Sequence, residues 1–244
     1  MARKAGKAAS PAGVHEIPTD GIPEWKRQSV ERSLQTAWAR AQERSDRFVA
    51  AAIDLMEQQG STDFTVQDVV DRSRMSIRTF YKFFASKDDL LVAVHETILS
   101  REVLPRLRKY CEAEKDPVGR LRAYIEGLYG LSRAGPVPRA LTTYYNRLAE
   151  TRPAELDRAF SAQIGLVIEL VQGAAAAGCL RGALDPEKAA HLLHHTVLAA
   201  AHARVLGSET RDISAEDLWV FCANGIGVDP RPALTVRASA GPDR

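Results

Sequence analysis

Hydrophobic residues recur with a helical period along most of the chain. Between residues 45 and 228 apolar side chains return every three or four positions, and Gly or Pro residues interrupt the pattern between the segments. No internal repeat and no run of eighteen apolar residues is visible in this pattern, so it favours neither a solenoid nor a membrane span. We therefore expect an all-α fold. In the second half of the chain the expected helices cover 117–132, 137–150, 153–178, 185–206 and 214–226.

Residues 65–84 are predicted to form two short helices joined by a tight turn. Thr65 can cap the first helix, with Asp68 three residues later to cap in return, and Ser76 repeats this signal eleven residues further on. Two start signals this close leave room for about two helical turns and a turn of about three residues, which are the dimensions of a helix-turn-helix.

The second of these helices has two different faces. Phe80 and Phe84 are four residues apart, so they share the face that can pack against the first helix. An exposed face rich in hydrogen-bond donors can read base edges and phosphates in a DNA major groove, and the hydroxyl of Thr79 could meet a phosphate at the start of the helix. The alternative is an ordinary amphipathic helix with a solvated basic face. The residues on the second face are Ile77, Arg78, Tyr81 and Lys82.

Residues 45–91 resemble the DNA-binding domain of the TetR family of bacterial one-component repressors, in particular the run SxxTFYKFF from Ser76 and the SKDDL that follows it. The resemblance implies that Thr79 and Tyr81 contact the operator and that Lys87 clamps a phosphate. It also places phosphate contacts near Arg44, for which solvated surface arginines are the alternative. The full set of expected DNA-binding residues is Arg44, Thr65, Arg74, Ser76, Ile77, Arg78, Thr79, Tyr81, Lys82 and Lys87.

Two positions depart from the family pattern. Arg74 stands where the family usually has a turn glycine, so either the turn is looser or Arg74 itself reaches DNA. Phe83 stands where a polar residue is common, so we expect a phosphate contact to be absent there.

The chain divides into an expected head, a body and two tails. Its 244 residues can hold a head of about 50 residues and one larger domain. Residues 23–44, with Trp25 and Trp38, are expected to form an extra amphipathic helix that leans on the head or joins a dimer partner. The basic segment at residues 1–22 has no apolar stretch of the kind found in a signal peptide. The expected order is a disordered basic arm at 1–22, the extra helix at 23–44, the helix-turn-helix domain at 45–90, a regulatory and dimerisation domain at 91–228 and a disordered tail at 229–244.

A helix after Ser86 is expected to connect the head with the body. Ser86 and Asp89 form a capping signal, Leu90 and Val94 continue an inward stripe, and Pro105 should end or kink the helix. In the family that the chain resembles, this position belongs to the connector that transmits ligand binding.

The helices at 185–206 and 214–226 are the expected dimer interface. The first carries Ala and Leu around most of its circumference, and the second holds Leu218, Trp219 and Phe221. The resemblance implies a homodimer, which fits recognition of a palindromic operator in double-stranded DNA.

A small apolar or amphipathic effector is expected in the body, by resemblance to the pocket-forming helices of the family. Packing of ordinary core residues is the alternative, as in a constitutive or architectural DNA-binding protein without a ligand. The candidate ligand-binding residues are His95, Tyr124, Leu128, Tyr144, Tyr145 and Asn146.

Composition and charge serve mainly to argue against other classes of function, such as an enzyme or a metal-binding protein. The net charge of +2 is too small to indicate nucleic-acid binding by itself. Residues 61–90 hold five basic and five acidic side chains, so the prediction of DNA binding depends on where the basic side chains lie and not on their number. The sequence lacks a glycine-rich phosphate loop, GxSxG and HExxH, so we expect no enzyme and no cofactor. Three scattered cysteines fit a reducing cytoplasm. His191, His194, His195 and His202 share one predicted helix, and interface histidines are favoured over a metal held by His191 and His195.

Overall fold

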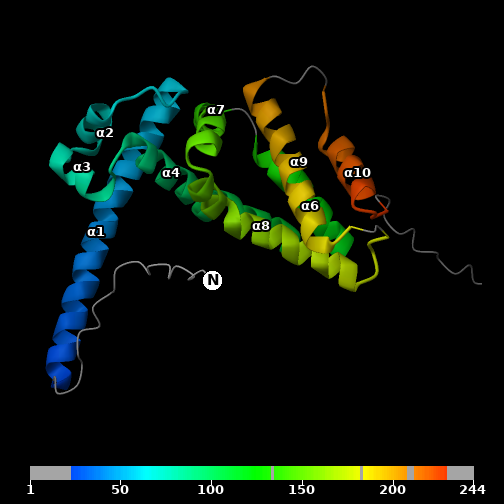
Figure 1. Ribbon diagram of the computed structural model, residues 1–244, viewed down its shortest axis with the longest axis horizontal. Coiled ribbons are helices and arrows are strands. Elements are labelled where there is room, and N and C mark those ends of the chain that lie inside the picture. The colour runs from blue at the N-terminus through cyan, green and yellow to red at the C-terminus, as the bar shows by residue number, and fades with distance from the viewer. Residues whose placement is uncertain (1–22, 133–134, 182–183, 208–211, 230–244) are drawn as a thin grey trace, which may run out of the picture. The chain divides into compact units, whose positions relative to one another are not determined.

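The computed structural model describes residues 23–132, 135–181, 184–207 and 212–229, and every regular element in these ranges is a helix (Figure 1). The predicted all-α fold is confirmed. The predicted arm at 1–22 and nearly all of the predicted tail at 229–244 lie outside the described residues. The elements in chain order are α1 (Glu24–Gln59), α2 (Val66–Ser73), α3 (Ile77–Phe83), α4 (Lys87–Ile98), the π-helical turn η1 (Leu99–Val103), α5 (Leu104–Glu112), α6 (Pro117–Leu131), α7 (Pro136–Thr151), α8 (Pro153–Ala176), α9 (Pro186–Leu206) and α10 (Ala215–Gly225).

Helix α1 is one uninterrupted helix where the sequence suggested two. The segment between Trp38 and Ser45 contains no Gly or Pro that could break the backbone hydrogen bonds, so the extra helix runs directly into the first helix of the head. The chain separates into two compact units, residues 1–44 and 45–244. In the first unit, the described part of α1 exposes the large side chains Trp25, Leu34 and Trp38.

The head of the second unit is held together by aromatic packing. The Phe48 ring on α1 meets the Phe80 ring edge-to-face, with 5.4 Å between centroids, and the Phe84 ring with 6.3 Å. Edge-to-face geometry stabilises such pairs beyond their buried area. The burial of Phe80 and Phe84 fixes which face of α3 points away from the head.

The connector neither ends at Pro105 nor continues as a regular α-helix. Pro105 has no amide hydrogen to donate to the carbonyl four residues earlier, and the preceding turn, Leu99–Val103, is π-helical before α5 continues. The local distortion expected from the proline is therefore present, and the chain remains helical through it.

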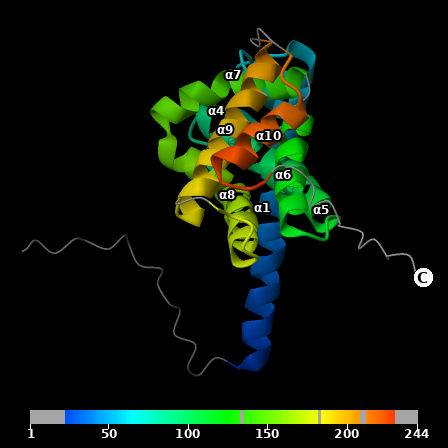
Figure 2. The same ribbon diagram turned by 90° about the vertical axis from the view of Figure 1, so that its right-hand side faces the viewer.

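The body consists of α6 to α10, with bounds within about two residues of those predicted. Helix α8 packs along α9 and α6, and α10 lies against α6 and α9 (Figures 1 and 2). Trp219, Tyr124 and Tyr129 are fully buried in this core. By length and apolar composition alone α8 could cross a membrane. It is packed as a core helix in this fold, and such helices pass the same test.

Candidate functional site

The start of α2 is fixed by the predicted reciprocal cap. The Asp68 amide donates to Thr65 Oγ1 at 3.2 Å, and the Thr65 amide donates to Asp68 Oδ2 at 2.7 Å. The bonds from the Thr65 amide and hydroxyl hold the pKa of Asp68 below its usual value. The predicted DNA contact at Thr65 therefore involves a side chain that already shapes the helix start.

Arg74 ends α2 in the left-handed conformation, with φ of 55°. This conformation costs a residue with a Cβ atom about 1–2 kcal/mol, which explains why a glycine suits the position. The turn is therefore a tight left-handed one, and the Arg74 side chain is exposed on it.

Ser76 starts α3 as predicted. The Thr79 amide donates to Ser76 Oγ at 3.1 Å, and the two hydroxyl oxygens lie 2.8 Å apart. The Thr79 hydroxyl, expected to face a phosphate, is thus paired with Ser76 in this structure.

The predicted recognition face of α3 is open to solvent. Ile77 is 42% exposed and Tyr81 57% exposed, and Arg78 and Lys82 are exposed beside them. Neither Arg78 nor Lys82 forms an ion pair with another described residue. Phe83 points inward instead, where its ring lies 6.5 Å from that of Phe48, which fits the absence of a phosphate contact there.

Lys87 and Arg44 are placed differently from the α3 residues. The Lys87 ammonium donates to the carbonyl oxygens of Thr62 at 2.9 Å and Phe64 at 3.1 Å, so it fastens the loop before α2. Arg44 belongs to the first unit, residues 1–44, and is exposed there. DNA contacts by both residues remain predictions.

The first turn of α4 is tied to the body. The Tyr144 hydroxyl donates to Asp88 Oδ1, and Arg152 pairs with Asp89. Arg152 Nη2 also reaches Ser86 Oγ at 3.3 Å. Helix α4 is therefore held by α7 and by the start of α8 at the point where it leaves the head.

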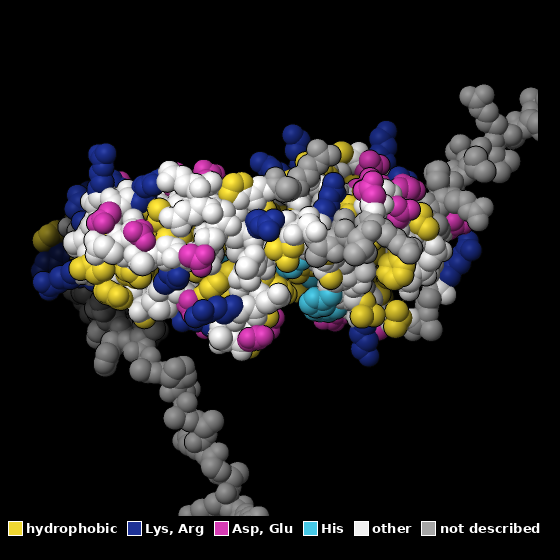
Figure 3. Space-filling model, turned by 90° about the horizontal axis from the view of Figure 1, so that it is seen from above, with side chains coloured by type: hydrophobic (Ala, Val, Ile, Leu, Met, Phe, Trp, Pro, Cys, Tyr) yellow, Lys and Arg dark blue, Asp and Glu magenta, His cyan; other side chains and the backbone are white. Residues whose placement is uncertain are grey.

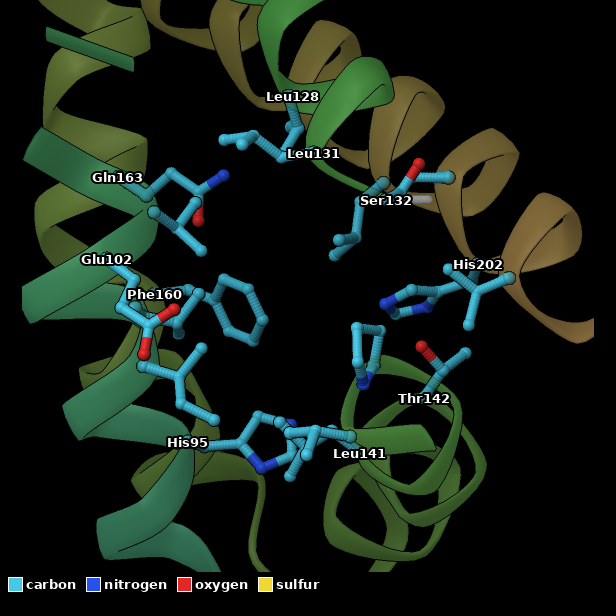
Figure 4. Close-up of a pocket in the computed structure, with 18 of the residues that line it drawn as sticks. His95, Glu102, Leu128, Leu131, Ser132, Leu141, Thr142, Phe160, Gln163 and His202 are labelled. Carbon is cyan, nitrogen blue, oxygen red and sulfur yellow. The ribbon is translucent and has the colours of Figure 1, made fainter. Parts of the chain in front are cut away.

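A cavity of about 340 Å³ lies inside the second unit (Figure 4). Side chains from α4 and η1 form one wall, and side chains from α1, α6, α7, α8 and α9 form the others. Of the predicted ligand residues, His95 and Leu128 line it. The lining residues are Ile53, Glu57, His95, Ile98, Leu99, Glu102, Val103, Leu128, Leu131, Ser132, Val137, Pro138, Leu141, Thr142, Phe160, Gln163, Leu198, Ala201, His202 and Val205.

Four predicted ligand residues do not line this cavity. The Tyr124 hydroxyl is buried 2.9 Å from His194 Nδ1, and Tyr144 is bonded to Asp88. The Tyr145 ring packs against His202, with 4.7 Å between centroids, so it supports the cavity from behind its lining. Asn146 is exposed to solvent. Tyr124 lies on α6 and the other three lie on α7, two helices that border the cavity, but the rotation of each helix turns these side chains away from it.

Polar lining residues were missed, and one of them had a signal in the sequence. Gln163 is 2% exposed within the apolar run of α8, and neither its Nε2 nor its Oε1 has a hydrogen-bond partner among the described residues. Buried amides are normally paired, so such an orphan indicates a function. The sequence pattern places His202 only among the interface histidines of its helix. Thr142 gave no signal.

The histidines of the cavity are neutral at physiological pH. Burial lowers the pKa of His95 to about 4, with the Leu91 carbonyl opposing the shift, and burial also lowers the pKa of His202 to about 4. Elsewhere on α9, the His191 and His195 rings stack with 6.4 Å between centroids. Among the described residues, no three His, Cys, Asp or Glu side chains lie close enough together to hold a metal ion.

Helices α9 and α10 present an apolar surface. Leu192 and Val220 are exposed, and Phe221 is 68% exposed, whereas Leu218 and Trp219 are buried in the core of the body. Figure 3 shows histidine and hydrophobic side chains next to one another on one face of the molecule. The predicted contribution of Leu218 and Trp219 to a dimer surface is therefore wrong, because both side chains are buried in the core of the body.

Comparisons with known proteins agree with this arrangement. The model of the tetR family of bacterial regulatory proteins matches residues 48–94. An uncharacterized HTH-type transcriptional regulator from the dhlA 5′ region of Xanthobacter autotrophicus is 26% identical, over 53% of this chain and 77% of the relative.

Solved structures of regulators share the fold. RolR in complex with resorcinol superposes with a TM-score of 0.63 at 17% identity, over 79% of this chain and 91% of RolR. The fatty acid degradation regulator FadR from Bacillus halodurans superposes with a TM-score of 0.57 at 15% identity, over 72% of this chain and 97% of FadR. NemR from E. coli in its reduced form superposes with a TM-score of 0.56 at 18% identity, over 78% of this chain and 100% of NemR. From the helix-turn-helix geometry and the family match, residues 48–94 form a DNA-binding domain similar to that of the tetR family of bacterial regulatory proteins, and the chain shares its overall fold with solved regulators.

Proposed function

We propose that the protein is a homodimeric repressor that binds a palindromic operator in the bacterial cytoplasm and is released from it by a small apolar or amphipathic ligand. The cavity carries this proposal, because one of its walls is the helix that continues directly from the DNA-binding head. The proposal assigns the chain no catalytic step.

The exposed face of α3 is suited to reading DNA. Arg78 can bond to the edge of a guanine, Ile77 can touch a thymine methyl group, and Tyr81 can reach a base or a phosphate. Because Arg78 forms no ion pair with a described residue and Tyr81 is exposed, both are available to a duplex without first breaking an ion pair.

Occupancy of the cavity acts on α4 and η1. His95, Ile98 and Leu99 line the cavity from the connector, and Leu141 and Phe160 line it from the body. A ligand shifts the DNA-binding equilibrium only if it binds one arrangement of these walls more tightly than the other. We therefore expect the ligand to prefer an arrangement of the connector in which the distance between the two DNA-binding domains of the dimer no longer matches the two half-sites.

A dimer through α9 and α10 would cover the exposed Leu192, Val220 and Phe221. Large apolar side chains gathered on one surface commonly mark a protein interface, and the proposal assigns these three to such a surface. Two copies are also needed to read two half-sites about one helical turn, or a multiple of it, apart. A protein that stays monomeric at micromolar concentration would contradict this assignment.

The comparison with RolR supports a ligand of small size, because that regulator of the same fold was solved with resorcinol, a single substituted ring. The alternative, a constitutive or architectural DNA-binding protein, would have no use for a cavity next to its connector. The cavity favours the ligand-responsive function.

Selection of bound duplexes from a random DNA pool, read by sequencing at about 0.15 M salt, tests the proposal. We expect a palindromic motif with two half-sites at a fixed spacing. This motif then supplies the operator for ligand-release assays. Tight binding only at low salt with no enriched motif would instead support the architectural function.

A further inference from the structure

Gln163 holds an unpartnered amide at the wall of the cavity. Figure 4 shows its side chain directed into the open space between the helices. Burial raises the pKa of Tyr124, and the neighbouring Gln163 amide opposes that rise, but neither polar atom of the amide forms a hydrogen bond with a described residue. A buried amide with two unmade hydrogen bonds is costly, so a molecule that makes both would bind favourably.

A second unpartnered atom lies on the connector. His95 is buried, and its Nδ1 has no hydrogen-bond partner among the described residues. His95 and Gln163 come from α4 and α8, so a molecule bonded to both would join the connector to the body.

The charge of the cavity opposes an anion. Among its described lining residues none is Lys or Arg, and the formally charged ones are the exposed Glu57 and Glu102. Both histidines that line the cavity are neutral near pH 7, because burial holds their pKa values at about 4. A carboxylate or phosphate placed here would lose its hydration without gaining a cation.

The size of the cavity limits the ligand to a compact molecule. An apolar cavity of about 150 Å³ is enough for one benzene ring, and usual ligand pockets cover about 300–1,000 Å³. At about 340 Å³ this cavity fits a body of two fused rings, surrounded by Phe160, Leu128 and Leu141.

We propose that the cavity binds an uncharged molecule of about two rings that presents a hydrogen-bond donor and an acceptor side by side to Gln163. This inference rests on the proposed function, because it names the ligand class of the same cavity. A lactam has the matching geometry, since its N–H can donate to Oε1 while its carbonyl accepts from Nε2.

Calorimetric titration of the full chain with three two-ring probes tests the proposal. The probes are 2-quinolone, which is a lactam, N-methyl-2-quinolone, which lacks the donor, and 2-naphthoate, which is an anion. We expect 2-quinolone to bind at least about 10-fold more tightly than its N-methyl form, from the loss of one buried hydrogen bond, and 2-naphthoate to bind more weakly than both. Equal affinities for the first two, tighter binding of the anion, or no binding of 2-quinolone at its solubility limit would overturn the proposal.

Gln163→Leu tests the same pairing from the protein side. Leucine is similar in size and removes both unpartnered atoms, so we expect the free variant to melt at a higher temperature than the parent and to bind 2-quinolone about 10- to 100-fold more weakly. Gln172→Leu is the matched control, since Gln172 lies on the same helix and is exposed. A Gln163→Leu variant with undiminished 2-quinolone binding would refute the assignment. The comparison of probes on the parent protein stands even if this variant does not fold.

Release of an operator duplex separates this inference from the function on which it rests. Binding of 2-quinolone that depends on Gln163, without release of DNA, would support the ligand class and contradict the proposed release mechanism. Release of DNA by an anionic or acceptor-only molecule, with no 2-quinolone binding, would contradict the ligand class and leave the release mechanism intact.

Discussion

The Tyr144 hydroxyl donates a hydrogen bond to Asp88, which joins α7 of the body to the first turn of the connector helix. Burial and the bond to Asp88 raise the pKa of Tyr144, so the hydroxyl remains a protonated donor across the physiological range. Any movement of α4 relative to the body must therefore carry Tyr144 with it or break this bond.

Replacement of Tyr144 by Phe should lower stability. The change removes one bond to a carboxylate and keeps the ring, so we expect a loss of about 1–2 kcal/mol in the free energy of unfolding, reduced from the value for a fully buried pair by the partial exposure of Asp88. Urea denaturation measures it. Tyr110→Phe is the control for removal of a tyrosine hydroxyl, because the exposed Tyr110 hydroxyl has no bond to a described residue. Equal midpoints for the two variants would show that the bond contributes nothing.

Replacement of Arg74 by Gly should stabilise the head. Glycine adopts the positive φ of this turn without a Cβ penalty but loses more freedom on folding, so we expect a net gain of about 1 kcal/mol. Arg74→Ala keeps the penalty and should show no gain in thermal denaturation. DNA affinity then decides the role of the side chain: an equal loss in both variants would assign a DNA contact to Arg74, and unchanged affinity would assign it to the turn alone.

Replacement of Arg78 or Tyr81 by Ala should weaken operator binding about 10- to 100-fold, as expected for the loss of a specific base contact of about 1–3 kcal/mol. Both side chains are exposed, so the circular dichroism spectrum and the oligomeric state should stay the same. Arg106→Ala is the control, since Arg106 is exposed on α5, away from the helix-turn-helix. Fluorescence anisotropy on the selected operator measures the effect. Unchanged affinity in both variants would show that α3 reads DNA with another face.

Acidification should destabilise the protein through His95. The unfolded chain takes up a proton on His95 below its ordinary pKa of 6.5, whereas the folded protein does so only below about 4, because burial disfavours the charge and His202 lies nearby. The unfolded state therefore binds more protons between these values, and stability falls as pH falls through this window. From pH 7 to pH 5 this group alone accounts for about 2 kcal/mol.

His95→Phe isolates this contribution. The variant should lose about 2 kcal/mol less than the parent between pH 7 and pH 5, measured as the difference in urea unfolding free energy at the two pH values. His202 and His194, whose pKa values burial also lowers to about 4, keep part of the pH dependence in both proteins. Parallel pH profiles for parent and variant would show that His95 is not buried as a neutral ring.

Local signals were readable from the sequence, because they involve residues that are close along the chain. Thr65 with Asp68, and Ser86 with Asp89, form the reciprocal caps that their spacing predicts. The left-handed turn at Arg74 could be suspected only from the departure from a family pattern. Its conformation depends on the two helices that it joins, and an arginine does not signal it.

The position of the cavity and most of its lining residues could be identified only from the three-dimensional fold. Tyr144 and Leu141 lie three residues apart on α7, yet one bonds to the connector and the other lines the cavity, because a small rotation of the helix decides which neighbours each side chain meets. Sequence periodicity separates buried from exposed faces, but it cannot say which buried positions border an empty space. Gln163 was the exception in principle, since an amide among apolar residues signals a site before the fold is known.

The π-helical turn at Leu99–Val103 has a consequence for how this chain is compared with others. A π turn holds one residue more than an α turn, so it behaves as a one-residue insertion absorbed within a helix. Deleting one residue there would turn α5 by about 100° relative to α4 and swing the buried Leu107 and Cys111 away from the core. A one-residue gap at this point in an alignment with a shorter relative would thus mark a change of helical register, and the residues on either side of it would have to be matched as two separate helices.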